Sequence, residues 1–268
     1  INSDADLSAE CKVPGPPPED FSLSIIDGEN FRARLFPSLS LLVEVNNLFG
    51  SFPFCAGVLI GERWVLTAAH CIFSLIPDQV QVWLGVSSIM EAKADEDVCV
   101  EKLEVDEIII NEGFDAGSNS FEDDIALLKL KTASEYATAR LDTDPYGVYS
   151  GNYTIAGWGG RRGELLQDRP QKAEFPQSEE CSTRYPSFNN SIQICTKGLG
   201  DSTACSGDSG SPLYKPLDAG LVYTVSGGVS YGDSQCSLND PFVSFRVYAY
   251  LNWICENTNG NVCDAFSP

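Results

Sequence analysis

The chain has 268 residues, with 38 Asp and Glu against 17 Lys and Arg, and its formal net charge is −21 at pH 7. This excess of negative charge argues against nucleic acids and anionic membranes as partners, and no apolar run approaches the roughly 18 residues of a membrane-spanning helix. Ten cysteines in a chain of this length indicate an oxidising compartment, so we expect a secreted, extracellular protein.

The first 24 residues form an acidic, proline-rich segment. Residues 14–18 contain four prolines and one glycine, a composition that favours a stiff, extended spacer. The acidic start of the chain is unlike a secretory signal, so we expect any such signal to have been removed already.

From residue 25 onward, short apolar runs alternate with turn residues. The 23 glycines and 15 prolines of the chain separate these runs, and this pattern favours an all-β architecture over a helical one. Only the tail from about Arg246 to Glu256 has the apolar spacing of a helix. The length suits one large domain or two small barrels.

The only histidine of the chain, His70, lies in the segment Trp64–Cys71. Histidine has an ordinary pKa of about 6.5, which makes it the most frequent general base near neutral pH. A single histidine is more often a core or surface residue than a catalytic one. The catalytic hypothesis therefore depends on partners elsewhere in the chain.

Two later segments offer such partners. Asp124 opens the apolar run 125–130, where a partly buried carboxylate can accept a hydrogen bond from an imidazole N–H, although acids before strands are also common turn residues. Ser209 lies in a turn between Gly207 and Gly210. Such a turn can project the hydroxyl and aim backbone N–H groups at a developing oxyanion, which is worth roughly 2.7–4 kcal/mol per donor. By itself, the same sequence could also be an ordinary tight turn.

The order of His70, Asp124 and Ser209 resembles the chymotrypsin-like (trypsin-fold, S1-type) serine protease family. The resemblance extends from Ile25 to about Asn257, which is nearly the whole chain. Further segments carry it in the same order along the chain: Ile25-Ile26-Asp27-Gly28-Glu29, Cys55-Ala56-Gly57, Gly157-Trp158-Gly159, Ser230-Tyr231-Gly232 and Asn252-Trp253-Ile254. The number and order of these segments make the resemblance specific.

The resemblance implies an all-β fold of two packed antiparallel six-stranded β-barrels with a C-terminal helix. Residues 25–135 would form the first barrel with His70 and Asp124, and residues 136–245 the second with Ser209, so that the active cleft lies between them. Residues 246–268 would form the C-terminal helix and tail, and residues 1–24 an N-terminal pro-segment or extension. Residues 25–257 together would be one peptidase domain.

The resemblance also implies three disulfides. The first would fix the loop that carries His70, and the third would join the two walls of the specificity pocket; the three are Cys55–Cys71, Cys181–Cys195 and Cys205–Cys236. Sequence alone does not determine how the other four cysteines pair. We expect a short C-terminal loop closed by one disulfide and an N-terminal extension tethered by another, namely Cys255–Cys263 and Cys11–Cys99.

The same resemblance implies the chemistry. Ser209 would attack the scissile carbonyl, His70 would transfer the proton, and Asp124 would orient the imidazole. The backbone N–H groups of Gly207 and Ser209 would form the oxyanion hole. This chemistry needs no cofactor and no metal, and the cysteines lack a compact metal-ligand spacing.

Activation follows from the family pattern as well. In the family, cleavage frees a new N-terminus whose ammonium pairs with the acid before the catalytic serine. Here these residues are Ile25 and Asp208, and the uncut chain would be a weakly active zymogen. Ser24 precedes Ile25 where many relatives carry Arg or Lys, so activation by a trypsin-like enzyme is not expected at this bond. A chain that is never cut and stays inactive is the alternative.

Five positions match the primary specificity (S1) pocket of the family: Thr203, Ala204, Ser230, Gly232 and Phe242. Thr203 replaces the aspartate of trypsin-like enzymes, so a bound Arg or Lys side chain would lack a counter-ion. Phe242 stands on a wall that is glycine in trypsin and chymotrypsin. Its ring either fills much of the cavity, which leaves a shallow pocket for small side chains, or turns into the space left by Ser244, which replaces the usual aromatic residue.

The sequence therefore predicts a secreted, monomeric serine endopeptidase that is made as a zymogen and forms an acyl-enzyme, with an elastase-like preference for small apolar residues. Its partners would be protein or peptide substrates and protein protease inhibitors. The alternative is a catalytically silent or never-activated homologue that acts as a binding protein. Sequons at Asn152 and Asn189 permit glycosylation. A calcium loop within residues 85–101 is conceivable, but the sequence shows no clear ligands there.

Overall fold

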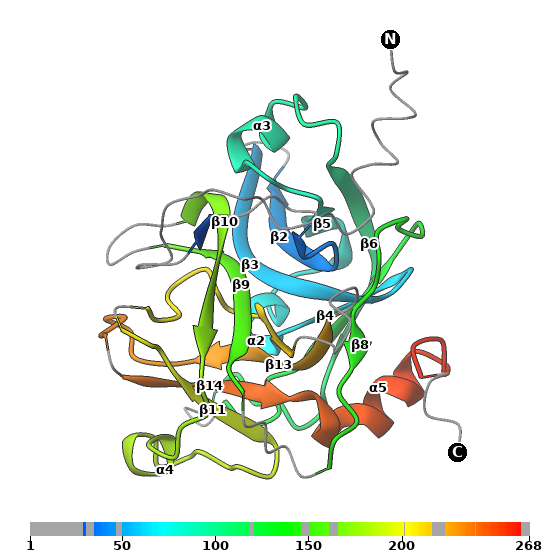
Figure 1. Cartoon of the computed structure of the whole chain (residues 1–268). Coiled ribbons are helices and arrows are strands. Elements are labelled where there is room, and N and C mark those ends of the chain that lie inside the picture. Colours follow the sequence, from blue (N-terminus) through cyan, green and yellow to red (C-terminus); the bar gives the residue numbers. More distant parts are fainter. Residues whose placement is uncertain are drawn as a thin grey trace.

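A computed structural model describes residues 29–30, 35–46, 50–117, 121–145, 151–160, 166–200, 202–215, 223–238 and 240–263. Strands dominate these ranges and form two bodies of β-structure, which Figure 1 shows as an upper half with β2, β3 and β5 and a lower half with β11, β13 and β14. The predicted all-β, chymotrypsin-like fold is therefore confirmed.

The first body is a closed barrel of six antiparallel strands in the order β2-β3-β4-β7-β6-β5. Closure leaves no strand edge unpaired, and the buried apolar side chains fill the barrel interior. Its strands are β2 (Leu39–Asn46), β3 (Gly50–Gly61), β4 (Trp64–Thr67), β5 (Val80–Leu84), β6 (Glu101–Ile110) and β7 (Ala126–Leu130).

The second body is an eight-stranded sheet with the order β1-β10-β9-β12-β13-β14-β11, and β8 pairs in parallel with β13. Two of its strands, β1 and β8, are only two residues long, and the other six correspond to the predicted barrel. The strands are β1 (Glu29–Asn30), β8 (Arg140–Leu141), β9 (Tyr153–Gly159), β10 (Leu166–Phe175), β11 (Gln193–Lys197), β12 (Pro212–Lys215), β13 (Thr224–Tyr231) and β14 (Pro241–Arg246). β1 belongs to the segment expected in the first barrel, yet it pairs with β10 of the second sheet.

Helices are short and lie at the ends of strands. They are α2 (Ala69–Ile72), η2 (Pro77–Gln79), α3 (Ile89–Lys93), α4 (Cys181–Arg184), η3 (Val247–Tyr250) and α5 (Leu251–Asn257). The predicted C-terminal helix is present as η3 followed by α5, which is red in Figure 1. Within the described ranges, no helix has both the length and the apolar character that crossing a membrane requires.

One hydrophobic cluster joins the two bodies. It contains the barrel interior together with Trp158 and Tyr214 of the second sheet and Ile254 of α5. A buried hydrogen bond of 2.8 Å between the hydroxyls of Ser38 and Tyr214 crosses the same boundary. A second cluster fills the interior of the second sheet and consists of Tyr153, Ile155, Phe175, Ile194, Leu213, Val229 and Phe242.

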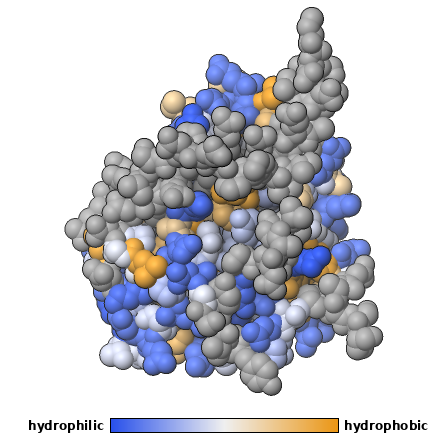
Figure 2. Space-filling view, in the orientation of Figure 1, coloured by the Kyte–Doolittle hydropathy of each residue, from blue (hydrophilic) through white to orange (hydrophobic). Residues whose placement is uncertain are grey.

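Hydrophilic residues dominate the described part of the face in Figure 2, and the apolar patches there are small and separate. This is the surface expected of a strongly acidic chain, because charged side chains stay in water.

Candidate active site

His70 and Asp124 lie at the same end of the closed barrel because of how β4 and β7 pair. β4 is buried along its whole length and runs antiparallel to β7, with Thr67 opposite Ala126. Because the end of one strand lies beside the start of its antiparallel neighbour, residues just after β4 meet residues just before β7. His70 in α2 and Asp124 occupy these two positions.

The carboxylate of Asp124 is the centre of a buried hydrogen-bond group. Its side chain is 1% exposed. Oδ1 accepts a hydrogen bond of 2.8 Å from the backbone N–H of His70, and Oδ2 lies 2.7 Å from Nδ1 of the same residue. Oδ2 also accepts a hydrogen bond from the hydroxyl of Ser230. Since a carboxylate only accepts, Nδ1 carries the proton and neutral His70 keeps a lone pair on Nε2. This is the tautomer that a general base requires.

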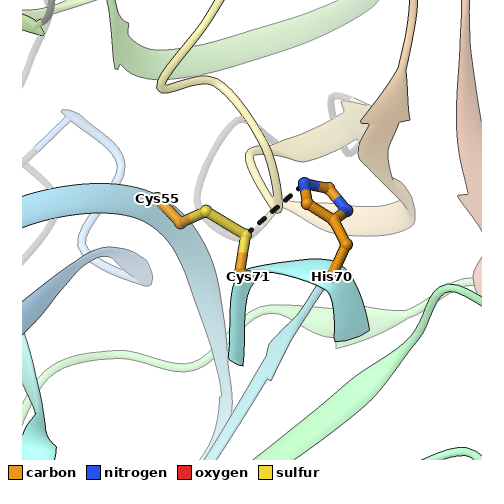
Figure 3. Close-up of side chains that lie close together, drawn as sticks. All are labelled: Cys55, His70 and Cys71. Atoms are coloured by element: carbon orange, nitrogen blue, oxygen red, sulfur yellow. Dashed lines mark hydrogen bonds between the residues drawn. A yellow bond between two sulfur atoms is a disulfide. The ribbon is translucent and has the colours of Figure 1, made fainter. Parts of the chain in front are cut away.

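Nε2 of His70 faces the disulfide between Cys55 and Cys71, as Figure 3 shows, at 3.9 Å from the sulfur of Cys71. These three residues also form a group with the spacing of metal ligands. Both sulfurs are bonded to each other, so neither is available as the thiolate that binds zinc. The disulfide instead joins β3 to α2, the helix that carries His70.

The turn that carries Ser209 is held against the same end of the barrel by backbone contacts. The carbonyl of Ser209 accepts a hydrogen bond of 2.8 Å from the N–H of Ala56, and the N–H of Gly210 donates to Val229 at 2.7 Å. Gly210 has φ +77°, and a Cβ there would lie 2.2 Å from the carbonyl oxygen of Ala56. Only glycine fits this close, left-handed turn.

The structure therefore joins His70 and Asp124 directly and brings Ser209 to them through its backbone. Among the described residues, the hydroxyl of Ser209 makes no hydrogen bond with His70. The backbone N–H groups of Gly207 and Ser209 donate to no other described residue. Gly207 has φ +96°, a conformation that suits glycine.

Asp208 is buried behind this turn and is 3% exposed. Its Oδ1 accepts a hydrogen bond of 2.8 Å from the N–H of Gly159, and its Oδ2 accepts one of 3.0 Å from Cys205. Burial raises the pKa of Asp208 to about 6, against the opposing effect of these two backbone hydrogen bonds. No cation in the described ranges pairs with it, and its expected partner Ile25 lies outside them.

With this geometry in place, comparisons with known proteins identify the family. The sequence pattern that defines trypsin matches residues 25–254. The chain belongs to the trypsin family. Members of this family are chymotrypsin-like serine proteases.

Three relatives illustrate the similarity. Coagulation factor XI of Bos taurus is 33% identical over 217 residues, which cover 77% of this chain and 33% of factor XI. Melanization protease 1 of Drosophila melanogaster is 30% identical and phenoloxidase-activating factor 3 of Holotrichia diomphalia 29% identical, each over 89% of this chain. The chain spans 66% of the length of the first and 73% of the second of these insect proteins.

The disulfides of this trypsin-family chain follow the predicted pairing wherever both cysteines are described. Four are present: Cys55–Cys71, Cys181–Cys195, Cys205–Cys236 and Cys255–Cys263. Cys99 also takes part in a disulfide. Its expected partner, Cys11, lies outside the described residues.

The five positions expected in the specificity pocket have different surroundings. Thr203 is 4% exposed, and its hydroxyl donates to the carbonyl of Ala204 at 3.3 Å. The ring of Phe242 is buried and meets Phe175 edge-on, with 5.1 Å between the ring centroids. A Cβ on Gly232 would lie 2.9 Å from that of Phe242. Phe242 therefore belongs to the second hydrophobic cluster while its Cβ borders Gly232, and Ala204 packs against the same cluster.

Sequence reasoning missed two features of the site. Ser230 was assigned to the pocket without a contact to Asp124, but its hydroxyl donates to that carboxylate. Phe121 and Tyr231 were not assigned to the site, yet Phe121 lies edge-on to His70 at 5.8 Å and stacks on Tyr231 at 5.3 Å. The segment that contains Ser230 and Tyr231 carried the family resemblance, but residue types alone do not tell which way each side chain turns.

The raised pKa of Asp208 predicts how stability depends on pH. The folded chain holds this proton more tightly than the unfolded chain, whose pKa is near the ordinary 3.8. The contribution of Asp208 to stability is therefore complete below about pH 4 and is lost as the pH rises through about 6, a difference of up to about 3 kcal/mol.

Urea unfolding of the uncut chain at several pH values between 4 and 7 measures this effect against the variant Asp208→Asn. We expect the free energy of unfolding of the native chain to decline relative to the variant over this range. Parallel curves would show that Asp208 is not the titrating group.

Proposed function

We propose that this trypsin-family chain is a serine endopeptidase, with Ser209 as nucleophile, His70 as general base and Asp124 as the residue that orients it. The observation that supports this most strongly is the buried contact between Asp124 and Nδ1 of His70. A buried acid that fixes the tautomer of the only histidine has a use in proton transfer and no evident use in binding alone.

The reaction would proceed in two halves. Ser209 Oγ attacks the scissile carbonyl carbon while Nε2 of His70 takes the hydroxyl proton, and the N–H groups of Gly207 and Ser209 bind the oxyanion. The tetrahedral intermediate collapses as His70 delivers its proton to the leaving amine, which leaves an acyl-enzyme. Water then attacks the ester with His70 again as base, and Ser209 regains its proton as the acid product leaves. Asp124 stabilises the imidazolium throughout.

The protein would be made as a zymogen. Asp208 is a buried carboxylate without a cation among the described residues, and burying an unpaired charge costs free energy. An ammonium at Ile25, freed by cleavage after Ser24, would neutralise it. The hydroxyl of Ser209 makes no hydrogen bond with His70 in the described uncut chain. We infer that pairing of Asp208 with the Ile25 ammonium would reorder the adjacent turn so that this hydrogen bond can form.

Covalent labelling with a fluorophosphonate tests this function. The variant Ser24→Arg lets trypsin cut before Ile25, and N-terminal sequencing verifies the cut. We expect a mass increment on Ser209 in the cut form and little or none in the uncut form, with cut Ser24→Arg/Ser209→Ala as control. If the cut form is inert, the protein is not an active serine protease.

The alternative is a binding protein on the same fold. It is favoured by the missing hydrogen bond between Ser209 and His70 in the described chain. An inert Ser209 in both forms, together with a correctly verified cut, would support it.

For the substrate, we propose small apolar residues before the scissile bond, as in elastase-like enzymes. Thr203 carries no charge for an Arg or Lys side chain, and Phe242 brings its Cβ against the Gly232 wall where a glycine would leave more room. The bond after Ser24 would suit such a pocket, so self-processing is consistent with it. Peptides that end in Ala or Val should be cut much faster than those that end in Arg or Phe.

Replacing Phe242 by glycine tests the pocket. We expect Phe242→Gly to accept Leu or Phe before the scissile bond, because removal of the ring deepens the cavity. Truncating a buried aromatic side chain costs about 3–5 kcal/mol, so stability must be measured in parallel. Phe36→Ala is the matched control, since it truncates a buried phenylalanine of the first cluster, apart from Phe242, and should destabilise without changing selectivity. Unchanged selectivity in a folded Phe242→Gly variant would contradict the proposal.

We also propose that the protein is secreted. Four disulfides within the described ranges form and persist only in an oxidising compartment.

A further inference from the structure

The turn that carries Asp124 is strained. The N–H of Ile125 donates to the carbonyl of Asp123 at 2.7 Å, which closes a three-residue turn around Asp124. Asp123 has φ +50° and Phe121 has φ +46°, both in the left-handed region that residues with side chains rarely adopt. Such conformations persist only where the surroundings hold them. This turn aims the Asp124 carboxylate inward at His70.

Two residues from the other half of the chain hold these strained positions. The hydroxyl of Tyr250, in η3, donates to Oδ1 of Asp123 at 2.8 Å. The side-chain amide of Gln193, in β11, donates to the carbonyl of Phe121 at 3.2 Å. Tyr250 is 6% exposed. Burial first, and the hydrogen bond to Asp123 next, raise the pKa of Tyr250 far above its ordinary range, so that the phenol stays protonated as a donor.

Gly113 limits the space around the other carboxylate oxygen of Asp123, the one that Tyr250 does not contact. A Cβ on Gly113 would lie 2.2 Å from Oδ2 of Asp123, so the backbone of Gly113 packs directly against this carboxylate. The Asp123 side chain is thus held between Gly113 and Tyr250. Removing the Tyr250 hydroxyl would take away the only hydrogen bond that the Asp123 carboxylate makes with another side chain among the described residues.

We propose that Tyr250 is a positioning residue for Asp124: its hydroxyl holds Asp123 in the strained turn that points the Asp124 carboxylate at Nδ1 of His70. The inference rests on the proposed function, because Asp124 matters to catalysis only if His70 is the base. Within the described residues, the Tyr250 hydroxyl bonds to Asp123 and makes no hydrogen bond with His70.

Because the chain contains one histidine, proton NMR of the uncut chain tests the geometry without any need for activity. An imidazole N–H that is hydrogen-bonded to a carboxylate resonates far downfield, and in a chain with one histidine such a resonance has a single source, Nδ1 of His70. We expect Tyr250→Phe to shift this resonance or broaden it by exchange. Tyr248→Phe is the matched control, since Tyr248 lies in the same η3 and is 37% exposed; it should leave the resonance in place.

A second pair of variants covers the case in which Tyr250→Phe does not fold. Asp123→Ala removes the acceptor and should move the resonance as Tyr250→Phe does. Asp123→Asn keeps an acceptor oxygen and tolerates positive φ, so it should retain the resonance. An unchanged resonance in folded Tyr250→Phe, or in Asp123→Ala, would overturn the proposal.

Kinetics on the cut form adds a second measurement. We expect Tyr250→Phe to lower kcat about tenfold while KM stays within about twofold, because the substrate pocket is untouched. A shifted resonance with no fluorophosphonate labelling of the cut Ser24→Arg chain would leave this inference standing and defeat the proposed function. Normal labelling of the cut chain with an unmoved resonance in Tyr250→Phe would support the proposed function and overturn the positioning role of Tyr250.

Discussion

Asp124→Asn should lower kcat of the cut protein about 10⁴-fold, since an asparagine at this position of a catalytic triad favours the wrong histidine tautomer. Oδ2 of Asp124 accepts hydrogen bonds from both Nδ1 of His70 and the Ser230 hydroxyl. An amide has one acceptor oxygen and one donor nitrogen, so it cannot accept from Nδ1, Ser230 and the backbone of His70 at once. The imidazole would present Nε2–H to Ser209 and could not take its proton.

Hydrolysis of a fluorogenic peptide measures this loss, with the thermal midpoint as a check on folding. Asp168→Asn is a suitable control: its carboxylate binds the Ser88 hydroxyl and the N–H of Met90 at the start of α3, away from His70. We expect its kcat to remain close to that of the native sequence. A kcat of Asp124→Asn within tenfold of the native value would refute the assigned role of Asp124.

Lys215→Ala should lower the free energy of unfolding by about 3–5 kcal/mol, because it leaves a buried carboxylate without its cation. Nζ of Lys215 lies 2.7 Å from Oδ2 of Asp142, and the two side chains are 13% and 12% exposed. The same oxygen accepts a hydrogen bond of 2.6 Å from Ser226. The ion pair joins β12 to the segment after β8, and the hydrogen bond from Ser226 adds β13.

Urea unfolding measures the cost. Lys131→Ala is the matched control, since Lys131 pairs with Glu104 at 3.2 Å on the exposed surface, where water screens the pair, and its loss should cost much less than that of Lys215. The double variant Lys215→Met/Asp142→Leu should recover most of the stability, because neither charge then remains buried. If Lys215→Ala and Lys131→Ala lowered the free energy of unfolding equally, the buried ion pair would contribute no more to stability than the exposed one.

Several parts of this molecule could be predicted because they depend on local sequence. The β4–α2 segment with His70, the turn with Ser209 and the strand after Asp124 each have a distinctive composition, and their order along the chain identifies the family. Cys255–Cys263 could also be anticipated, since only a short loop separates the two cysteines and closing it costs little entropy.

Other parts could not be predicted because they depend on which way a side chain turns. Phe242 could have filled the pocket or moved toward Ser244, and only the contacts with Phe175 place its ring. Ser230 could have faced the pocket or Asp124. Nothing near Lys215 in the sequence points to Asp142, which lies 73 residues away.

The amino-acid order by itself, through its resemblance to the family, determined the class of fold and implied three of the disulfides, since the motifs that carry the resemblance are local. Only the tertiary structure decided how Tyr250 reaches Asp123, how Ser230 reaches Asp124 and why β1 joins the second sheet. The physical reason is that a hydrogen bond or a strand pair between distant segments depends on the packing of both halves, which no local pattern records.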